Sequence, residues 1–234
     1  MLADKSFLSS LGISRDNLFI TTKLSPGDQA KEQCRNSVLT SLEKLKLDFI
    51  DLVLIHWPGS SGIDPKSPKN AELRKKSWLD LEQLCREKKI RAIGVSNYTI
   101  KHLTELLDYC SIKPTVNQVE FHPFLNQNDL LTFCKEQHIV LQAYSSLGSS
   151  DGWKTLSQLS QIIEVADNRE KSIAQVLLRW ALQHEIPVIP KTSRIEKLRD
   201  NFDLFSFSLN DEEMKQFDSL DKQQHFCWNP DSIL

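Results

Sequence analysis

Short apolar runs alternate along this chain with longer segments in which apolar residues recur at helical spacing. The runs, rich in β-branched and aromatic residues, occupy residues 18–22, 49–56, 91–96, 115–121, 139–145 and 187–190. Several are almost continuously apolar, which is typical of strands buried on both faces of a parallel sheet. Apolar residues at the helical period mark residues 29–45, 72–88, 101–110, 129–138 and 172–184. The pattern predicts strands and helices in alternation.

The spacing of the predicted strands distinguishes between architectures. Their first residues are too far apart for hairpins and lie at the distance that a βα unit requires. Repeated βα units form either an open doubly wound sheet or a closed barrel. The chain has only seven glycines and neither a G-x-G-x-x-G nor a Walker motif, which disfavours a doubly wound nucleotide-binding fold. A closed barrel usually has eight strands and about 250 residues, so the six predicted strands fall short of it.

Composition and charge narrow the class of protein. The 29 Lys and Arg residues nearly balance the 31 Asp and Glu residues, so the net charge is −2 and no basic surface for nucleic acid is expected. No apolar run approaches the length of a transmembrane helix, and the first residues lack the layout of a secretory signal. The five cysteines are far apart and form no CxxC pair, which indicates reduced thiols and no zinc site. We therefore expect one cytoplasmic domain over residues 1–234, without a metal, a nucleic acid or a membrane as partner.

Polar or ionisable residues stand at the end of each predicted strand, where a βα barrel builds its active site. They are Lys23, His56, Ser96, Asn97, Gln118, Glu120, Tyr144, Ser145 and Lys191. Strands end in loops and loops are polar, and this plain interpretation explains any single position. It explains less well why Lys, His and Tyr, whose proton affinities shift on burial, stand where Asp, Asn or Gly is usual. An active site at these strand ends is the competing hypothesis.

A basic cluster follows the last predicted strand. The residues from Lys191 to Arg194 (Lys-Thr-Ser-Arg) lead into a predicted helix that carries Lys197 and Arg199. The first N–H groups of a helix are unpaired, so hydroxyls and cations there make a site for an anion such as a phosphate monoester. A solvated basic helix face capped by Ser or Thr explains the same residues, and both interpretations stay open.

His56 and Trp57 precede a loop rich in Gly, Ser and Pro. A neutral imidazole N–H at position 56 could bind a carbonyl oxygen, and Trp57 could form one wall of an apolar pocket. A core histidine and a tryptophan packed under the loop are the alternatives. Glu120 has no second carboxylate at a neighbouring strand end, so a glycosidase-like pair is not expected, and His122 is expected to be structural. The other histidines are expected on the surface without partners: His102, His138, His184 and His225.

Six segments in succession are similar to the motifs of a known family. They read FITTK (19–23), DLVLIHWP (51–58), IGVSN (93–97), NQVEFHP (117–123), QAYSSLG (142–148) and IPKT (189–192). In order and spacing, from about residue 14 to the C-terminus, they resemble the aldo-keto reductases. The resemblance implies an α/β fold, the (β/α)8 TIM barrel, with NADPH bound across its C-terminal face. It also implies the reduction of a small-molecule aldehyde or ketone by hydride transfer, and a monomer when the barrel is complete.

The resemblance also implies roles for individual residues. Lys23 and His56 match two members of the catalytic set, and Trp57 and Trp228 would line the substrate pocket. For the cofactor it implies Ser96, Asn97 and Gln118 at the carboxamide, Tyr144 stacked on the nicotinamide, Ser145, Leu147 and Gly148 at the pyrophosphate, Lys191, Thr192, Ser193 and Lys197 at the 2′-phosphate, and Asp200 and Asn201 near the adenine. Lys197 stands where many members carry Arg, which keeps the charge but loses the planar fork.

The chain departs from the family pattern before Lys23. The family's catalytic Tyr and Asp belong to the second barrel strand, whereas tyrosines occur here only at positions 98, 109 and 144. Residues 1–11 look like the end of the first barrel helix, so the N-terminal hairpin and the first two barrel strands are expected to be missing, which leaves the strand at 18–23 as an unpaired edge. The resemblance is then compatible with a truncated reductase of impaired activity. It is also compatible with a silent NADPH-binding or regulatory protein, similar to the barrel-type channel β subunits.

Overall fold

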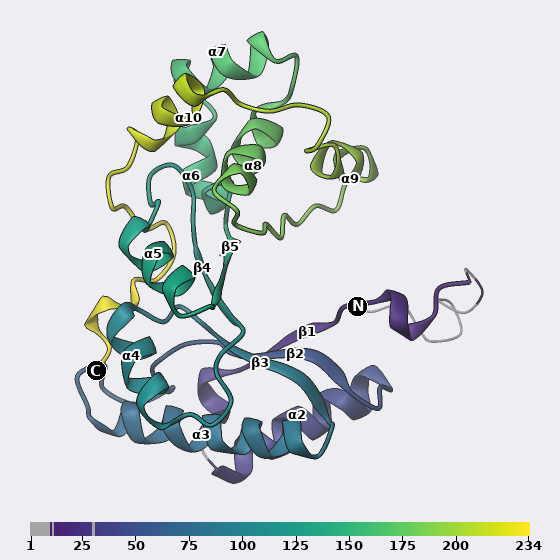
Figure 1. Ribbon diagram of the computed structural model, residues 1–234, viewed down its shortest axis with the longest axis vertical. Coiled ribbons are helices and arrows are strands. Elements are labelled where there is room, and N and C mark those ends of the chain that lie inside the picture. Colours follow the sequence, from purple (N-terminus) through teal and green to yellow (C-terminus); the bar gives the residue numbers. More distant parts are fainter. Residues whose placement is uncertain (1–9, 11, 30) are drawn as a thin grey trace. The chain divides into compact units, whose positions relative to one another are not determined.

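The computed structural model describes residue 10, residues 12–29 and residues 31–234 (Figure 1). The expectation for residues 1–11 therefore lies, apart from residue 10, outside the described residues. The chain forms two compact units, and each is described by itself. Unit 1 contains Met1–Asn117 and Pro230–Leu234, and unit 2 contains Gln118–Asn229.

Unit 1 is built on three parallel strands. They are β1 (Thr21–Leu24), β2 (Ile50–Ile55) and β3 (Ile90–Ser96). The register places Thr21 opposite Leu52 and Leu24 opposite Ile55. Every residue of β2 is buried, as its continuous apolar run predicts for a strand covered on both faces. Strand β1 begins later than predicted, because residues 15–17 form a short 3-10 helix, η1 (Arg15–Asn17), and Leu18 closes it by donating its N–H to the Arg15 carbonyl.

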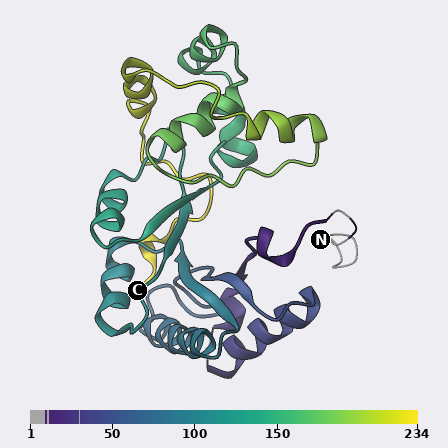
Figure 2. The same cartoon turned by 45° about the vertical axis from the view of Figure 1, so that its right-hand side comes forward.

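Three helices accompany these strands, close to their predicted positions. They are α2 (Lys31–Leu45), α3 (Lys69–Arg86) and α4 (Ile100–Tyr109). Helices α2 and α3 pack against each other on one side of the strands, as Figures 1 and 2 show. Two 3-10 helices complete the unit, η2 (Pro26–Asp28) after β1 and η3 (Pro230–Ser232) near the C-terminus. The unit therefore consists of βα repeats, as the spacing of the strands predicted.

Unit 2 is mainly helical. Strand β4 (Val116–Glu120) passes from unit 1 into unit 2, and β5 (Val140–Tyr144) lies within it. Its helices are α5 (Asn128–Glu136), α6 (Ser149–Leu156), α7 (Ser160–Asn168), α8 (Ile173–Gln183), α9 (Ile195–Phe202) and α10 (Asp211–Asp218). The core centres on α8, where the buried Trp180 ring stacks on Phe121 with the ring centres 4.8 Å apart.

The sixth predicted strand, at residues 187–190, does not form. Val188 makes only an isolated parallel bridge with Ala143, whose N–H donates to the Pro187 carbonyl at 2.8 Å. Pro187 and Pro190 carry no N–H and cannot donate to a ladder, so the apolar composition misleads at this segment.

The described strands follow the chain order β1-β2-β3-β4-β5 in one sheet, and the class is α/β as predicted. Strand β1 ends this order, and β2 is its only partner among the described residues. The Ile20 carbonyl accepts from β2 and the Leu24 carbonyl from His56, just after β2. Thr21 and Lys23 alternate with these residues and therefore direct their N–H and C=O groups to the opposite edge. No helix within the described ranges is long and apolar enough to cross a membrane.

Candidate active site

Lys23 and His56 stand at the C-terminal ends of neighbouring strands. The register sets Lys23 opposite Leu54, and the His56 N–H donates to the Leu24 carbonyl at 3.1 Å. Burial lowers the pKa of Lys23. The pKa of His56 is lowered as well, first by burial and then by the positive charge of Lys23. The imidazole is therefore neutral at pH 7 and able to donate one N–H, and Lys23 supplies a positive charge close to it.

The end of β3 is joined to the end of β2 by one side-chain amide. Asn97 has a left-handed backbone (φ 64°), and its Nδ2 donates to the His56 carbonyl at 3.0 Å and to Ser96 Oγ at 3.1 Å. Ser96 and Asn97 are buried. The structure thus joins the predicted cofactor residue Asn97 to the main chain of the predicted catalytic residue His56, and to Ser96.

The loop after β2 is held from the loop before α2. Gln29 is buried, and its Nε2 donates to the Trp57 carbonyl at 2.6 Å and to the Gly59 carbonyl at 3.0 Å. The Trp57 side chain is half-buried. Gln29 is thus a positioning residue that sequence reasoning missed.

In unit 2, the ends of β4 and β5 place Gln118 and Tyr144. Gln118 Nε2 donates to Gln142 Oε1 at 2.7 Å, which links the two strands through their side chains. Tyr144 is half-buried, and burial raises its pKa, so its phenol stays neutral and presents an uncharged ring.

A tight turn follows β5. The Gly148 N–H donates to the Ser145 carbonyl at 2.7 Å, and both residues have positive φ, 81° at Gly148 and 49° at Ser145. A Cβ added to Gly148 would lie 2.7 Å from the main chain of Gly152, so a side chain does not fit there. The turn carries Leu147, which is half-buried, and leads directly into α6. A compact turn of this kind lets a ligand approach the backbone closely.

The basic cluster before α9 is exposed. Lys191 and Ser193 are exposed, and Thr192 Oγ1 accepts from the Arg194 N–H at 3.1 Å just before the helix begins. Within the helix, Lys197 Nζ lies 2.8 Å from Asp200 Oδ2. Asn201 is half-buried next to this pair. Lys197 thus shares its charge with a carboxylate, whereas Lys191 projects its charge from the loop.

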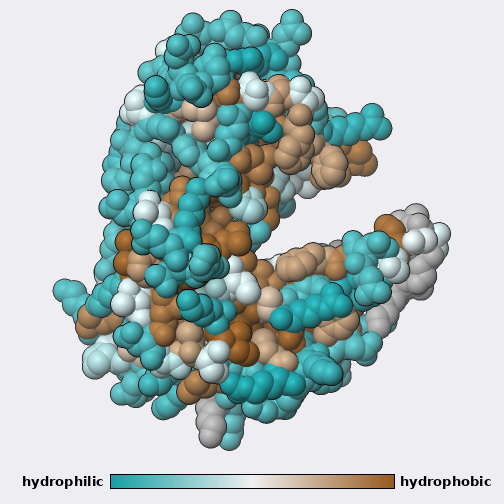
Figure 3. Space-filling view, viewed as in Figure 1, coloured by the Kyte–Doolittle hydropathy of each residue, from teal (hydrophilic) through white to brown (hydrophobic). Residues whose placement is uncertain are grey.

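Apolar surface accompanies these charges on α9. Ile195, Leu198 and Phe202 are exposed, and Figure 3 shows apolar surface over this helix. An open surface pocket of about 610 Å³ is lined by Leu198, Arg199, Phe202 and Asp203. One side of α9 therefore combines apolar side chains with a guanidinium.

Comparison with known proteins agrees with this arrangement. Residues 5–222 match the aldo/keto reductase family. The chain belongs to that family. Over 223 residues it is 43% identical to a glyoxal reductase of Bacillus subtilis (strain 168), an alignment that covers 95% of this chain and 75% of that protein.

Solved aldo-keto reductases have the same fold. An aldo-keto reductase enzyme from a Medee basin deep-sea metagenome library superposes with a TM-score of 0.86 at 36% identity, over 97% of this chain and 79% of that one. The Bombyx mori aldo-keto reductase, solved in complex with NADP, superposes with a TM-score of 0.83 at 29% identity, over 95% and 74% of the two chains. The predicted fold class, the (β/α)8 barrel of the aldo-keto reductases, is thus confirmed, and the family places the chain among the oxidoreductases that act on small carbonyl compounds.

One buried carboxylate of this aldo-keto reductase has donors that the sequence did not indicate. Glu120 accepts from His122 Nε2 and His225 Nδ1, each at 3.0 Å, and from the N–H groups of Phe226 and Cys227 at 2.8 and 3.2 Å. Burial alone would raise the pKa of Glu120, but these donors lower it to about 2. Glu120 is therefore ionised at neutral pH and holds residues 225–227 of unit 2 by these contacts.

The histidine assignments need a second correction. His102 is buried, and His184 Nε2 lies 2.8 Å from Asp218 Oδ1, so neither is a surface side chain without partners. His225 was also expected to lack a partner, but its Nδ1 lies 3.0 Å from Glu120 Oε2. The Ile233, Asp218 and Glu120 partners stand 34 or more residues away in sequence, where no local pattern indicates them. Thr99, which also contacts His102, is close in sequence. Trp228 is 81% exposed, and its place at a substrate pocket stays a prediction.

Proposed function

We propose that this chain is an NADPH-dependent reductase of aldehydes and ketones, and that residues 1–234 act as one cytoplasmic reductase domain. The observation that carries the proposal is the placement of a partly buried cation, Lys23, beside the neutral imidazole of His56 at adjoining strand ends. A neutral imidazole held by its main chain suits a carbonyl oxygen, which accepts but cannot donate.

The residues present fit a dinucleotide phosphate. The turn from Ser145 to Gly148 presents a compact main chain with positive φ at both ends, Lys191 presents an exposed positive charge ahead of α9, and Gln118 carries a side-chain amide. We assign the cofactor contacts as the resemblance implies: Ser96, Asn97 and Gln118 for the carboxamide, Tyr144 for the ring, Ser145, Leu147 and Gly148 for the pyrophosphate, Lys191, Thr192, Ser193 and Lys197 for the 2′-phosphate, and Asp200 and Asn201 for the adenine. When bound, NADPH supplies the hydride.

The chain's own groups orient the carbonyl and stabilise its developing charge. His56 donates its imidazole N–H to the carbonyl oxygen, and Trp57 lies next to it as a wall for the apolar part of the substrate. As the oxygen becomes an alkoxide, the positive charge of Lys23 stabilises it. Asn97 holds the His56 main chain and so fixes the direction from which the imidazole approaches.

Proton delivery is the weak step for a polypeptide of these 234 residues alone. Of its three tyrosines, Tyr98 is 1% exposed and its pKa is raised well above the ordinary value by burial, Tyr109 lies on α4, and Tyr144 is assigned to the nicotinamide. A positioned general acid typically contributes about 10²–10⁴-fold. We therefore propose that such a polypeptide binds NADPH but reduces aldehydes slowly.

None of the three tyrosines is assigned as the general acid, and this favours a second candidate function, a silent NADPH-binding protein. The two candidates differ in turnover and agree on cofactor binding. Titration with NADPH, followed by the quenching of tryptophan fluorescence, measures the binding. The absorbance of NADPH after an aldehyde is added measures the turnover.

The matched variants are Lys191→Ala and Lys215→Ala, the latter an exposed lysine on α10. Binding that weakens in Lys191→Ala and persists in Lys215→Ala supports the cofactor assignment. Oxidation of NADPH that depends on the aldehyde selects the reductase, and its complete absence in a chain that binds NADPH selects the silent protein. Loss of binding in neither variant, or no binding by the parent chain, contradicts both.

A further inference from the structure

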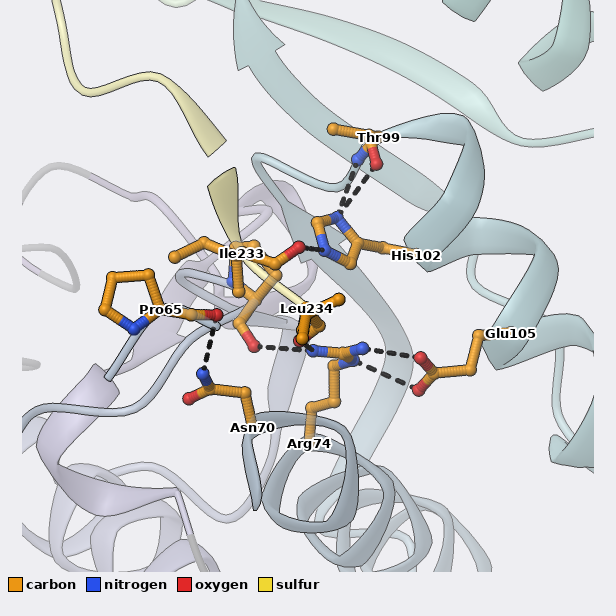
Figure 4. A network of polar contacts seen from close by, with 9 residues as sticks. Pro65, Asn70, Arg74, Thr99, His102, Glu105, Ile233 and Leu234 are labelled. Atoms are coloured by element: carbon orange, nitrogen blue, oxygen red, sulfur yellow. Dashed lines mark hydrogen bonds and ion pairs between the residues drawn. The ribbon is translucent and has the colours of Figure 1, made fainter. Parts of the chain in front are cut away.

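The last five residues of the chain are held in unit 1 by a network of polar contacts (Figure 4). The Leu234 N–H donates to the Pro65 carbonyl at 2.8 Å, and the Leu234 main-chain oxygen accepts from Arg74 Nη1 at 2.5 Å. His102 Nε2 lies 3.0 Å from the Ile233 carbonyl. All of these polar contacts are made to main-chain atoms of the segment, so its hydrogen bonds with unit 1 use its backbone.

Arg74 is the centre of this network. Its side chain is 1% exposed and lies against Glu105 in a two-point contact, Nε to Oε1 at 3.1 Å and Nη2 to Oε2 at 2.5 Å. Nη1 donates to the main-chain oxygens of Leu234 and Pro58. A buried guanidinium needs partners for its donors, so the contact with Leu234 helps to offset the cost of burying this charge.

His102 contributes a donor whose direction is set by its neighbour. Its Nδ1 lies 3.2 Å from the Thr99 N–H, which can only donate, so Nδ1 accepts and the proton resides on Nε2. Nε2 then donates to the Ile233 carbonyl. The start of α4 thereby presents a fixed N–H to the C-terminal segment.

The docked segment covers the loop that follows His56. The Ile233 side chain lies over Gly59, where an added Cβ would come within 3.3 Å of Ile233 Cδ1. Pro58 and Pro65, near the two ends of this loop, each give a carbonyl to the network. Residues 57–65 are therefore held between Arg74 and the segment 230–234.

We propose that Arg74 and His102 are positioning residues for the carbonyl substrate, acting through the segment 230–234 on the loop 57–65 and so on Trp57 and His56. The inference rests on the proposed reductase or NADPH-binding function, which supplies the substrate class. Release of the segment frees the loop and weakens the binding of an aldehyde. The cofactor contacts assigned to unit 2 are unaffected by it.

The experiment removes the segment and then returns it. A chain ending at residue 229 and the variant Ile233→Gly are compared with Ser232→Ala, a change at an exposed residue of the same segment. Hydrogen exchange reports on the loop through the Ser60 and Ser61 amides, which donate to Asn70 Oδ1 and the Pro26 carbonyl. Calorimetry measures the affinity of the NADPH-loaded chain for an aldehyde, which requires no turnover.

The expected result is faster exchange in residues 57–65 and an aldehyde affinity about tenfold weaker in the two disrupted chains, with the affinity for NADPH changed by less than about twofold. The peptide Pro-Asp-Ser-Ile-Leu, added at millimolar concentration to the shortened chain, restores the exchange protection, and the same peptide with Gly in place of Ile does not. Unchanged exchange, or faster exchange with an unchanged aldehyde affinity, overturns the inference. An equal loss of NADPH and aldehyde affinity shows a merely structural role and also overturns it. If the parent chain binds no NADPH, the proposed function fails, while the exchange result still decides whether the segment holds the loop.

Discussion

Two buried charges of opposite sign hold the C-terminal part of the chain, one in each unit. In unit 2, Glu120 accepts hydrogen bonds from the N–H groups of residues 226 and 227 and from two imidazoles, those of His122 and His225. In unit 1, Arg74 donates to the main-chain oxygens of Leu234 and Pro58 and forms an ion pair with Glu105. The carboxylate is stabilised by main-chain N–H groups and imidazole donors, whereas the guanidinium is paired with a carboxylate as well as with main-chain oxygens. The difference teaches that a main chain can satisfy either sign, because every residue offers both a donor and an acceptor.

We expect the largest loss of stability when the buried cation, Arg74, is replaced. In Arg74→Met, the Glu105 carboxylate loses its counter-charge and two carbonyls lose a donor, so we expect the free energy of unfolding to fall by about 3–5 kcal/mol. Urea unfolding followed by fluorescence measures the loss. Arg74→Lys keeps the charge without the fork and should lose less. A loss below about 1 kcal/mol in Arg74→Met would show that the contacts with Leu234 and Glu105 are dispensable.

The second prediction concerns how the free energy of unfolding depends on pH through His102 in unit 1. Burial and the charge of Arg74 lower the pKa of His102 to about 4 from its ordinary 6.5. The unfolded chain therefore binds a proton between pH 6.5 and pH 4 that the folded chain does not, and stability declines as the pH falls through this window, by about 3 kcal/mol. His102→Gln removes this contribution, so the variant should lose correspondingly less stability between pH 7 and pH 4. Parallel pH curves for the two proteins would contradict the neutral assignment of His102.

Neutralising the anion should cost somewhat less. Glu120→Gln keeps the shape of the side chain but points an amide at four donors, and we expect a loss of about 2 kcal/mol at pH 7. The folded pKa of about 2 lies below the ordinary value of 4.5, so this contribution is present above pH 4.5 and is lost as the pH falls toward 2. The difference in unfolding free energy between parent and variant should therefore shrink on acidification from pH 5. A constant difference across that range would mean that the charge of Glu120 is not what stabilises the contact.

An exposed ion pair shows how small the loss of stability should be when neither charge is buried. Lys154 Nζ lies 3.1 Å from Asp151 Oδ1, with side chains 74% and 81% exposed. Water already solvates both charges, so Lys154→Ala should change the free energy of unfolding by no more than about 0.5 kcal/mol. A loss comparable with that of Glu120→Gln, in the same urea series, would show that burial is not what distinguishes the two central charges.

The sequence predicted the parts of this molecule that depend on local pattern. The strand at Ile50–Ile55 is recognisable because its continuous apolar run matches burial on both faces, and the polar residues that follow it, His56 and Trp57, were placed correctly at its end. The failure at residues 187–190 has a local cause too, since prolines interrupt an otherwise apolar run.

The polar networks could not be predicted in this way. Apart from His122, the donors to Glu120 lie 105 to 107 residues along the chain, and the Leu234 oxygen lies 160 residues from Arg74. These partners are largely main-chain atoms, which are the same in every residue and leave no signal in the sequence. Only the fold brings them within hydrogen-bond distance.

Docking through the backbone also bears on how this protein can diverge. Arg74, His102 and Pro65 contact the carbonyl and amide groups of Ile233 and Leu234, whereas Asp231 and Ser232 are exposed. A change at the exposed Ser232 leaves these main-chain hydrogen bonds of the segment in place. Evolution can thus change the side chains displayed at this end of the chain while its attachment to unit 1 persists.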